Sequence, residues 1–308
     1  MRILAHIHTF NEAAFIDQAL EALQQQTRRP DAIVVVDNGS TDGTVDRAFG
    51  ANVTLIVNST DLGTSGSVGV GFAHGLEHGF DWIWVLDADS VPDPDALGNL
   101  LDFYERMPLA EREGVSFLAC RLASESNAAA HRPLAFTEAG LRFVSPAADP
   151  SGHCRCDLFI WSGSLFRAAA VAKIGLPSAD YFMDLSELDY GYRARRLGYT
   201  GYVVNSGVLH QDVGRNPGVA TRTWRFGPLS VRLYEMSPAR CYYYVRNMLY
   251  FWLYQFRPAR PRRIARTLVH AFVFPRTFAI RPFSHNRHLI ACARGVRDGL
   301  TGNMAARY

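Results

Sequence analysis

Continuous apolar runs alternate with stretches of helical periodicity over the first 120 residues. These short apolar runs predict strands, and the run at 82–86 has no polar/apolar alternation, which is typical of a strand covered on both faces. Strands are expected at 2–8, 32–36, 53–57, 82–86 and 115–120. Helices are expected over 13–26, from about 72 towards 79, and over 96–107. The alternation predicts an α/β fold with a mostly parallel sheet and right-handed crossovers.

The pattern is less regular in the second half of the chain. A strand and turn are expected over 157–164, followed by a helix over 167–174. The segment 124–151 is rich in Ala, Pro, Ser and His without a clear period, which indicates a surface excursion near the site. From about Trp224 the composition changes to aromatic and basic residues, and a C-terminal helical extension is expected there.

Two carboxylates, Asp87 and Asp89, follow the apolar run that starts at Trp82. Strand side chains repeat every two residues, so both are expected on the same side of the chain. Ligands bind at the carboxyl ends of strands in open α/β sheets, and paired carboxylates suit Mg²⁺ or Mn²⁺. The alternative is two solvated acids that begin the turn at Pro92.

Three further segments end strands with small or polar residues, at 9–12, 37–44 and 63–71. In a parallel sheet these ends converge on one edge with the carboxylate pair. Together they could bind a nucleotide. Acids and amides would contact its base and ribose, a glycine-rich loop would allow close approach, and a metal site would hold its phosphates. For each segment alone, ordinary turn chemistry is the alternative. The glycines do not form a dinucleotide fingerprint, because His74 stands where the last glycine belongs, and an NAD enzyme is not expected.

Composition excludes several classes of protein. At 308 residues and 48% hydrophobic content, the chain can bury a sizeable core, and a net charge of +3 is too small to indicate nucleic acid. The five cysteines are irregularly spaced, and the pair in 153–156 has no partner at zinc-finger spacing, so a reduced chain is expected. The first apolar run is too short for a signal peptide, which favours a cytoplasmic location.

Three of these segments resemble the successive motifs of family 2 glycosyltransferases: Thr9-Phe10-Asn11-Glu12, 34–44 and Leu86-Asp87-Ala88-Asp89. The resemblance runs from residue 1 to about 215 and implies an inverting enzyme with a GT-A fold that uses nucleotide sugars. A catalytic domain is therefore expected over 1–223, with a nucleotide-sugar half to about 120 and an acceptor half from 121. The change of composition at about Trp224 predicts an extension over 224–308. The resemblance also implies Mg²⁺ or Mn²⁺ on Asp87 and Asp89, and donor contacts from Thr9, Asn11, Glu12, Asp37, Asn38, Gly63, Gly66 and Asp87.

A later acidic motif of the family is matched over 181–199. Ser186 and Asp189 form a capping-box pattern, so Glu187 is expected at the start of a helix. The resemblance makes Glu187 the general base that takes the proton of an acceptor hydroxyl. Many members have Asp there, a departure that affects the reach of the base. Asp184 is a second candidate for the base.

Three other residues receive expected roles. Asp189 and Trp161 are expected to contact or support the acceptor, although Asp189 alone would suit the helix dipole. The resemblance places His210, at the end of an apparent strand, where it can complete the metal shell or contact the diphosphate. A packed or surface histidine is the alternative.

One base and one metal ion predict direct displacement with inversion, because the cation stabilises the leaving diphosphate without a protein acid. A retaining hydrolase would instead need two carboxyl groups flanking the bond. The alternatives are a sugar-phosphate nucleotidyltransferase, whose chemistry uses a glycine- and arginine/lysine-rich first loop that is missing here, and a non-catalytic scaffold that binds nucleotide sugar at a membrane.

The C-terminal extension carries a strong charge bias. The aromatic segment 241–256 is too short to span a bilayer, and 257–297 contains ten arginines and no acidic residue. This pattern favours the cytoplasmic face of an anionic inner membrane, where lipid-linked glycan acceptors of the resembled family are found. A packing appendage or an oligomer contact is the alternative, and no nucleic-acid motif accompanies the charge. The glycine segment and Arg246-Asn247 resemble bacterial rhamnosyl- or galactofuranosyltransferases of cell-surface polysaccharide synthesis.

Overall fold

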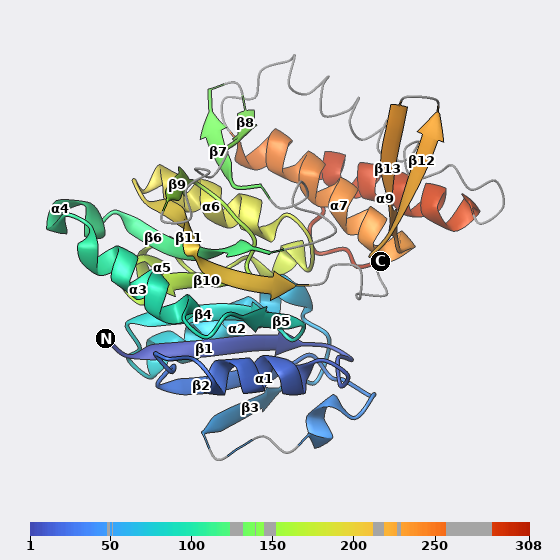
Figure 1. Ribbon diagram of the computed structural model, residues 1–308. Coiled ribbons are helices and arrows are strands. Elements are labelled where there is room, and N and C mark those ends of the chain that lie inside the picture. Colours follow the sequence, from blue (N-terminus) through green and yellow to red (C-terminus); the bar gives the residue numbers. More distant parts are fainter. Residues whose placement is uncertain are drawn as a thin grey trace. The chain divides into compact units, whose positions relative to one another are not determined.

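Four parallel strands form the first half of the sheet: β1 (Ile3–Thr9), β2 (Ala32–Asp37), β3 (Val53–Val57) and β4 (Trp82–Asp87). The computed structural model describes residues 1–47, 50, 52–123, 132–138, 140–144, 152–211, 219–226, 229–256 and 285–308. The four strands lie in the order β3-β2-β1-β4 (Figure 1). In register, Thr9 pairs with Asp37 and His8 with Asp87, so the three strand ends reach the same edge as predicted.

The sheet continues from β4 through strands of mixed direction. Its order is β4-β10-β6-β11-β5, with β10 antiparallel to β4 and β6, and β11 parallel to β6. These strands are β5 (Ser90–Pro92), β6 (Val115–Leu122), β9 (His153–Cys156), which pairs with β11, β10 (Ser164–Arg167) and β11 (Thr200–Gln211). The strand expected over 157–164 is wrong: a turn precedes Ser164, and the strand begins there.

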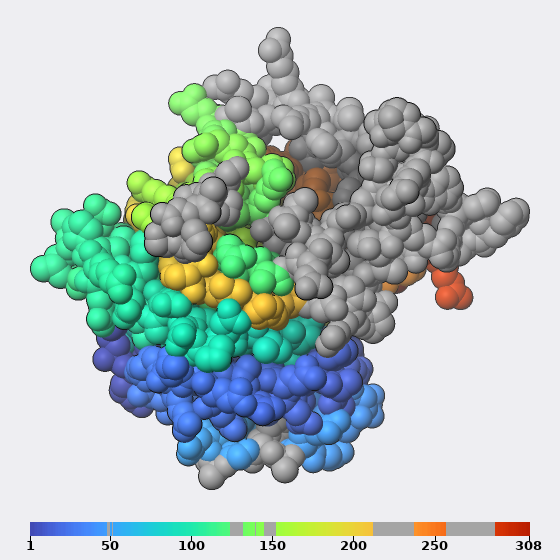
Figure 2. Space-filling view, in the orientation of Figure 1, coloured from blue at the N-terminus to red at the C-terminus, as the bar shows by residue number. Residues whose placement is uncertain are grey.

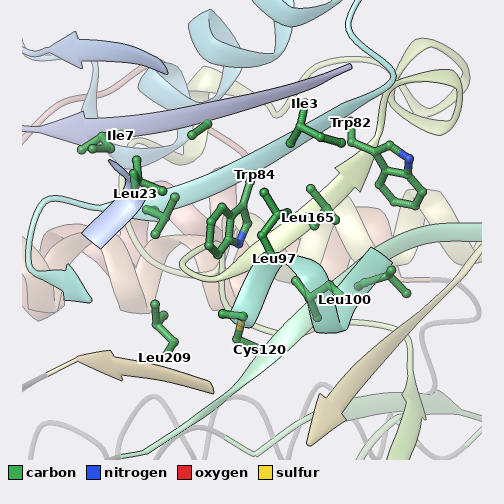
Figure 3. Packing of buried hydrophobic residues seen from close by; sticks show 14 of the residues in the cluster. Ile3, Ile7, Leu23, Trp82, Trp84, Leu97, Leu100, Cys120, Leu165 and Leu209 are labelled. Atoms are coloured by element: carbon green, nitrogen blue, oxygen red, sulfur yellow. The ribbon is translucent and has the colours of Figure 1, made fainter. Parts of the chain in front are cut away.

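Helices cover both faces of this sheet. They are α1 (Ile16–Gln24), α2 (Gly63–Glu77), α3 (Ala96–Arg106), α4 (Leu109–Arg112), α5 (Ala168–Ile174) and α6 (Ser186–Arg196), with short 3₁₀ turns η1 (Thr44–Asp46) and η2 (Ala179–Tyr181). One core cluster joins α1 and α3 to the sheet face that carries Ile3, Ile7 and Trp84 (Figure 3). The other joins α2, α5 and α6 to the face that carries Leu4 and Ile83. In the space-filling view, the blue to teal N-terminal residues lie together on the face shown (Figure 2).

The glycine-rich segment 63–71 is helical, which corrects the expectation of a loop. It forms the first turns of α2, and its small residues allow close helix–sheet packing. A Cβ on Gly71 would lie 2.5 Å from the His6 ring, and one on Gly75 would lie 2.6 Å from Ile83 Cδ1. Gly, Ser and Thr gave no apolar period, so the helix could not be recognised from the pattern.

A hairpin of β7 (Leu134–Thr137) and β8 (Gly140–Phe143) occupies part of the segment expected to be irregular. The rest of that segment lies outside the described residues, apart from 132–133, 138 and 144, which adjoin the two strands. Contacts divide the chain into two units. The first comprises Met1–Ala179 and Tyr190–Asp212, and the second Asp180–Asp189 and Val213–Tyr308.

The second unit contains the expected C-terminal helices and an unexpected hairpin. The hairpin is β12 (Val219–Phe226) and β13 (Leu229–Met236). The helices are α7 (Pro238–Tyr250), capped by Ser237 and continued by a π-helical turn η3 (Phe251–Gln255), and α9 (His285–Thr301). Glycines let α9 approach α7, because a Cβ on Gly295 would lie 2.6 Å from Tyr242 O. Within the described residues, no helix has the length and apolar character needed to cross a membrane.

Candidate active site

The two predicted metal ligands lie together at the carboxyl edge of the first unit. Asp87 ends β4, Asp89 follows in the turn before β5, and Gln211 at the end of β11 reaches both. Gln211 Nε2 donates to Asp87 Oδ2 at 2.6 Å and to Asp89 Oδ1 at 3.2 Å. The side chains of Asp87 and Asp89 therefore face one common point.

Glu12 adds a third carboxylate to the electrostatics of this edge. Burial, with contributions from Asp87 and Asp89, raises the pKa of Glu12 to about 7. Burial and then the charge of Asp87 raise the pKa of Asp89 to about 6. Negative charge at this edge is thus disfavoured unless a positive group compensates it.

His8 is the nearest such group, and the sequence interpretation missed it. Its Nε2 lies 2.8 Å from Asp87 Oδ1. Burial opposes a charge on His8, but the carboxylates of Asp87, Glu12 and Asp89 outweigh this, and its pKa is raised. His8 and Asp87 are paired between β1 and β4, so the signal was available only once the strand order was known.

Ser162 supports the carboxylate pair from a distant segment. Its Oγ accepts the Asp87 backbone N–H at 3.1 Å and lies 2.6 Å from Ser90 Oγ. The neighbouring Trp161 is buried in the core, with its ring 5.3 Å from that of Tyr190. The predicted role of Trp161 in contacting or supporting the acceptor stays a prediction.

The first two motif loops are tied to each other. The Asn11 side chain accepts the Thr41 backbone N–H at 2.8 Å, and the Asn11 N–H donates to Ser40 Oγ at 2.8 Å. Thr9 Oγ1 donates to Glu12 Oε2 at 3.4 Å. These bonds hold Glu12 at the site through local loop geometry.

The other predicted donor residues make internal hydrogen bonds. Asp37 is fully buried and accepts the N–H groups of Gly39 and Ser40 at 2.9 and 2.8 Å. The Asn38 side chain accepts from Ser67 Oγ at 2.8 Å and donates to the Gly63 carbonyl at 3.4 Å. Gly63 and Gly66 are buried in the first turns of α2. Their roles in donor binding stay predictions.

His210 points to a different partner from the carboxylate pair. Its Nε2 lies 2.8 Å from Asp93 Oδ1, and its side chain is 53% exposed. Gln211, the next residue, contacts the pair instead. The role of His210 as a metal ligand or diphosphate contact stays a prediction.

The residues fit a divalent cation of the predicted kind. Within the described ranges, no cluster of three or more His, Cys, Asp or Glu residues forms a ready-made metal cage. Mg²⁺ does not need one, because it commonly uses one or two carboxylates and keeps its remaining positions for water and substrate phosphate. Asp87 and Asp89 supply two such oxygen ligands, and a cation held there would oppose the burial and the Asp87 charge that raise the pKa of Asp89.

The acidic motif begins in the second unit. The Leu185 carbonyl accepts the N–H groups of Leu188 and Asp189, so Ser186 is the first helical residue and not the cap predicted. Glu187 lies in the first turn of α6, and the Ser186 hydroxyl donates to its carboxylate at 3.4 Å. Asp184 binds Arg240, and Asp189 is buried. The base and acceptor roles stay predictions.

The sheet order fits a GT-A fold, and similarity to known proteins gives the class, which is a glycosyltransferase. The model of the family "Glycosyl transferase family 2" matches residues 5–114. The galactofuranosyltransferase GlfT1 of Mycolicibacterium smegmatis is 30% identical over 217 residues, which cover 68% of this chain and 70% of that protein. The chain therefore belongs to glycosyltransferase family 2.

Other known proteins agree with this class. The N-acetylglucosaminyl-diphospho-decaprenol L-rhamnosyltransferase of Mycobacterium tuberculosis is 27% identical over 242 residues, which cover 68% of this chain and 76% of that protein. The fold resembles S. aureus TarS with a TM-score of 0.60 at 15% identity, covering 98% of this chain and 49% of that one. It also resembles the mannosyltransferase PcManGT of Pyrobaculum calidifontis, solved with GDP-Man and Mn²⁺, with a TM-score of 0.54 at 17% identity, covering 100% of this chain and 76% of that one.

Ser162→Ala should lower both stability and activity. Removing the hydroxyl leaves the Asp87 N–H and the Ser90 hydroxyl without this buried partner, at a cost of about 1–3 kcal/mol, and releases Asp87 from its position. We expect turnover to fall about tenfold or more in an assay of nucleoside diphosphate release at a temperature where the variant is folded.

Ser164→Ala is the matched control. Its hydroxyl is equally buried but donates to the Ile160 carbonyl and does not contact Asp87. Urea unfolding should show a comparable loss of stability with turnover preserved. Equal turnover in the two variants would show that Ser162 does not act through Asp87.

Proposed function

We propose that this protein is an inverting, divalent-metal-dependent transferase that moves a sugar from a dTDP- or UDP-sugar to a hydroxyl of a glycan or lipid-linked acceptor in bacterial cell-surface polysaccharide synthesis. The observation that carries the proposal is the carboxylate pair Asp87 and Asp89, which share Gln211 at the carboxyl edge of a GT-A sheet. These two carboxylates could hold a divalent cation, which would supply positive charge to the diphosphate of the donor.

Asp87 and Asp89 hold Mg²⁺ or Mn²⁺ in this proposal, with His210 as a further ligand or a contact to the diphosphate. The bound cation supplies positive charge to the departing diphosphate. His8 and Ser162 hold Asp87 in place, since each binds a different atom of it. Glu12 and the loops at 9–12 and 37–44 line the same edge and bind the nucleotide part of the donor.

Glu187 takes the proton from the acceptor hydroxyl as that oxygen attacks the anomeric carbon. The bond from the anomeric carbon to the diphosphate oxygen breaks as the new glycosidic bond forms, so one displacement inverts the configuration. The supports are the place of Glu187 in the family motif and its position in the first helical turn, where the Ser186 hydroxyl contacts its carboxylate. Asp184 is the weaker candidate, because Arg240 binds both of its carboxylate oxygens.

The names of two relatives support the donor sugar and acceptor class. One is a galactofuranosyltransferase, and the other is a rhamnosyltransferase whose name specifies an N-acetylglucosaminyl-diphospho-decaprenol acceptor. We therefore propose rhamnose or galactofuranose as the transferred sugar and a diphospholipid-linked glycan as the acceptor.

A lipid-linked acceptor requires that the protein reach a membrane surface. The exposed side of α9 has residues suited to that contact. Leu289 and Ile290 are adjacent and 50% and 56% exposed, and Arg287 on the same helix is also exposed. Apolar side chains beside arginines suit the boundary of an anionic bilayer. We propose that α9 contacts the cytoplasmic face of the inner membrane. Most of the basic segment predicted to assist, residues 257–284, lies outside the described residues.

Asp89→Asn and Glu187→Gln should separate binding from chemistry. Asp89→Asn removes a charged metal ligand, so we expect weaker Mn²⁺-dependent binding of the nucleotide in calorimetry and lower turnover. Glu187→Gln removes the base and keeps the shape, so donor binding should be unchanged while transfer falls by roughly 10²–10⁴-fold.

Asp102→Asn, an exposed acid on α3 that pairs with Arg106, serves as the control and should behave as the unaltered protein. Retention of most transfer activity by Glu187→Gln would refute the base assignment. Unchanged metal-dependent binding in Asp89→Asn would refute the metal site.

The double variant Leu289→Ser/Ile290→Ser should bind anionic vesicles less tightly. Each side chain loses most of its apolar area, so we expect at least about tenfold weaker association with phosphatidylglycerol-containing vesicles in a sedimentation assay. Leu109→Ser, which alters a leucine 76% exposed on α4, is the control. If the double variant sediments with vesicles as well as the control does, α9 is not the membrane contact.

A further inference from the structure

The turn that leads into Glu187 has an unusual backbone. Phe182, Asp184 and Leu185 all have positive φ angles, of 61°, 56° and 66°. Positive φ is uncommon for residues other than glycine, and such positions persist only where their surroundings hold them. Three of the four residues 182–185, directly before α6, have positive φ. This indicates that specific contacts hold the turn that precedes the helix.

Asn247 of α7 provides most of those contacts. Its Nδ2 lies 2.9, 2.8 and 2.8 Å from the carbonyl oxygens of Tyr181, Met183 and Asp184, which share its two N–H groups. The side chain is fully buried. One amide group thus gathers three carbonyls that the turn directs inward, and this accounts for how the turn keeps its shape.

Arg246 fixes the orientation of that amide. Its Nε and Nη2 donate to Asn247 Oδ1 at 3.0 and 2.8 Å, so the amide nitrogen must face the carbonyls. The same guanidinium donates to the Asp180 carbonyl and to the carbonyls of Met304 and Ala306, and it lies 4.9 Å from the centre of the Tyr243 ring. A fully buried arginine with this many carbonyl partners uses the fork geometry that lysine lacks.

Arg240, six residues before Arg246 on α7, holds the same turn from another direction. Its Nε and Nη2 contact both carboxylate oxygens of Asp184 at 2.8–3.1 Å. The ring of Phe182 stacks on Tyr243 at 4.7 Å. Side-chain contacts from α7 therefore reach every residue from Asp180 to Asp184.

We propose that Arg246, Asn247 and Arg240 are positioning residues for Glu187, and that α7 sets the orientation of the general base through the strained turn 181–185. The inference rests on the proposed role of Glu187. It assigns a catalytic purpose to the Arg-Asn pair, which neither the strand-end motifs nor the metal site explains. A base must be aligned with its proton to be effective, and a displacement of about 1 Å can lower the rate about 100-fold.

The test uses Asn247→Leu and Arg240→Met, each alone and combined with Glu187→Gln. Nucleoside diphosphate release from dTDP-rhamnose and UDP-galactofuranose gives kcat and donor KM. We expect each single variant to lower kcat about 100-fold with donor KM within twofold of the unaltered protein. In the Glu187→Gln background the same changes should cost nothing further, because the aligned carboxylate is already gone.

A structural readout accompanies the kinetics. Hydrogen–deuterium exchange should rise in peptides covering 181–189 for both variants. Val245→Ala is the matched control: it lies on α7, is buried and packs in a separate cluster with Cys241, Leu249 and Cys292. It should leave kcat and the exchange of 181–189 unchanged.

The outcomes separate this inference from the proposed function. If Glu187→Gln itself keeps most of its activity, the base assignment fails. If Glu187→Gln is inactive but Asn247→Leu and Arg240→Met keep full kcat, the positioning role is wrong and the base stands. If both changes lower the residual turnover of Glu187→Gln by the same factor as in the unaltered protein, their effect is general destabilisation and the positioning role is again wrong. Arg240 is only partly buried, so Arg240→Met tests the idea even if Asn247→Leu does not fold.

Discussion

Like charges that are partly withdrawn from water repel one another, and the first unit brings three carboxylates to one edge of its sheet. The parallel register of β1 and β4 sets this arrangement, because it pairs His8 with Asp87 and brings the loop of Glu12 alongside. Burial and the neighbouring carboxylates raise the pKa values of Glu12 and Asp89. His8 and Gln211 place nitrogen atoms against the carboxylate oxygens, and Ser162 accepts the backbone N–H of Asp87, so three distant segments hold this group. A site built to tolerate concentrated negative charge is well suited to a divalent cation and a diphosphate.

In the second unit, the main constraint is the backbone conformation of the turn before Glu187. Glu187 follows a turn whose backbone is unfavourable at three residues. The compensation comes from a buried arginine and asparagine on α7, whose donors are used on main-chain carbonyls. Every residue has a main-chain carbonyl whatever its side chain. Bonds to these carbonyls can therefore hold the turn without using the side chain of Glu187.

Much of the fold could be predicted because buried parallel strands are continuous apolar runs. The strands that end at Asp37, Val57 and Asp87 were recognised in this way. The helix that begins at Gly63 was missed, because its small residues have no apolar period and its glycines serve close packing against His6. The strand at Ser164 was placed too early, since it is short and antiparallel to its neighbours.

The candidate site was predictable only where its residues are close in sequence. Asp87 and Asp89 follow one strand, and their spacing predicted their common direction. His8, Ser162 and Gln211 were missed because they reach Asp87 only through the order and register of strands far apart in the chain. The contacts of Asn247 with the turn before Glu187 likewise depend on tertiary structure, although Arg246-Asn247 stood out as a pair in the sequence.

In the proposed function, Asp87 and Asp89 would hold a divalent cation, which would supply positive charge to the departing nucleoside diphosphate. The most direct test is diphosphate release by the purified protein from UDP-, dTDP- and GDP-sugars, each measured with Mn²⁺, with Mg²⁺ and with EDTA. We predict release from a dTDP- or UDP-sugar in the presence of metal and its loss in EDTA. Release that persists undiminished in EDTA would contradict the metal site. No release from any donor, together with no nucleotide binding by calorimetry, would contradict the proposed substrate class.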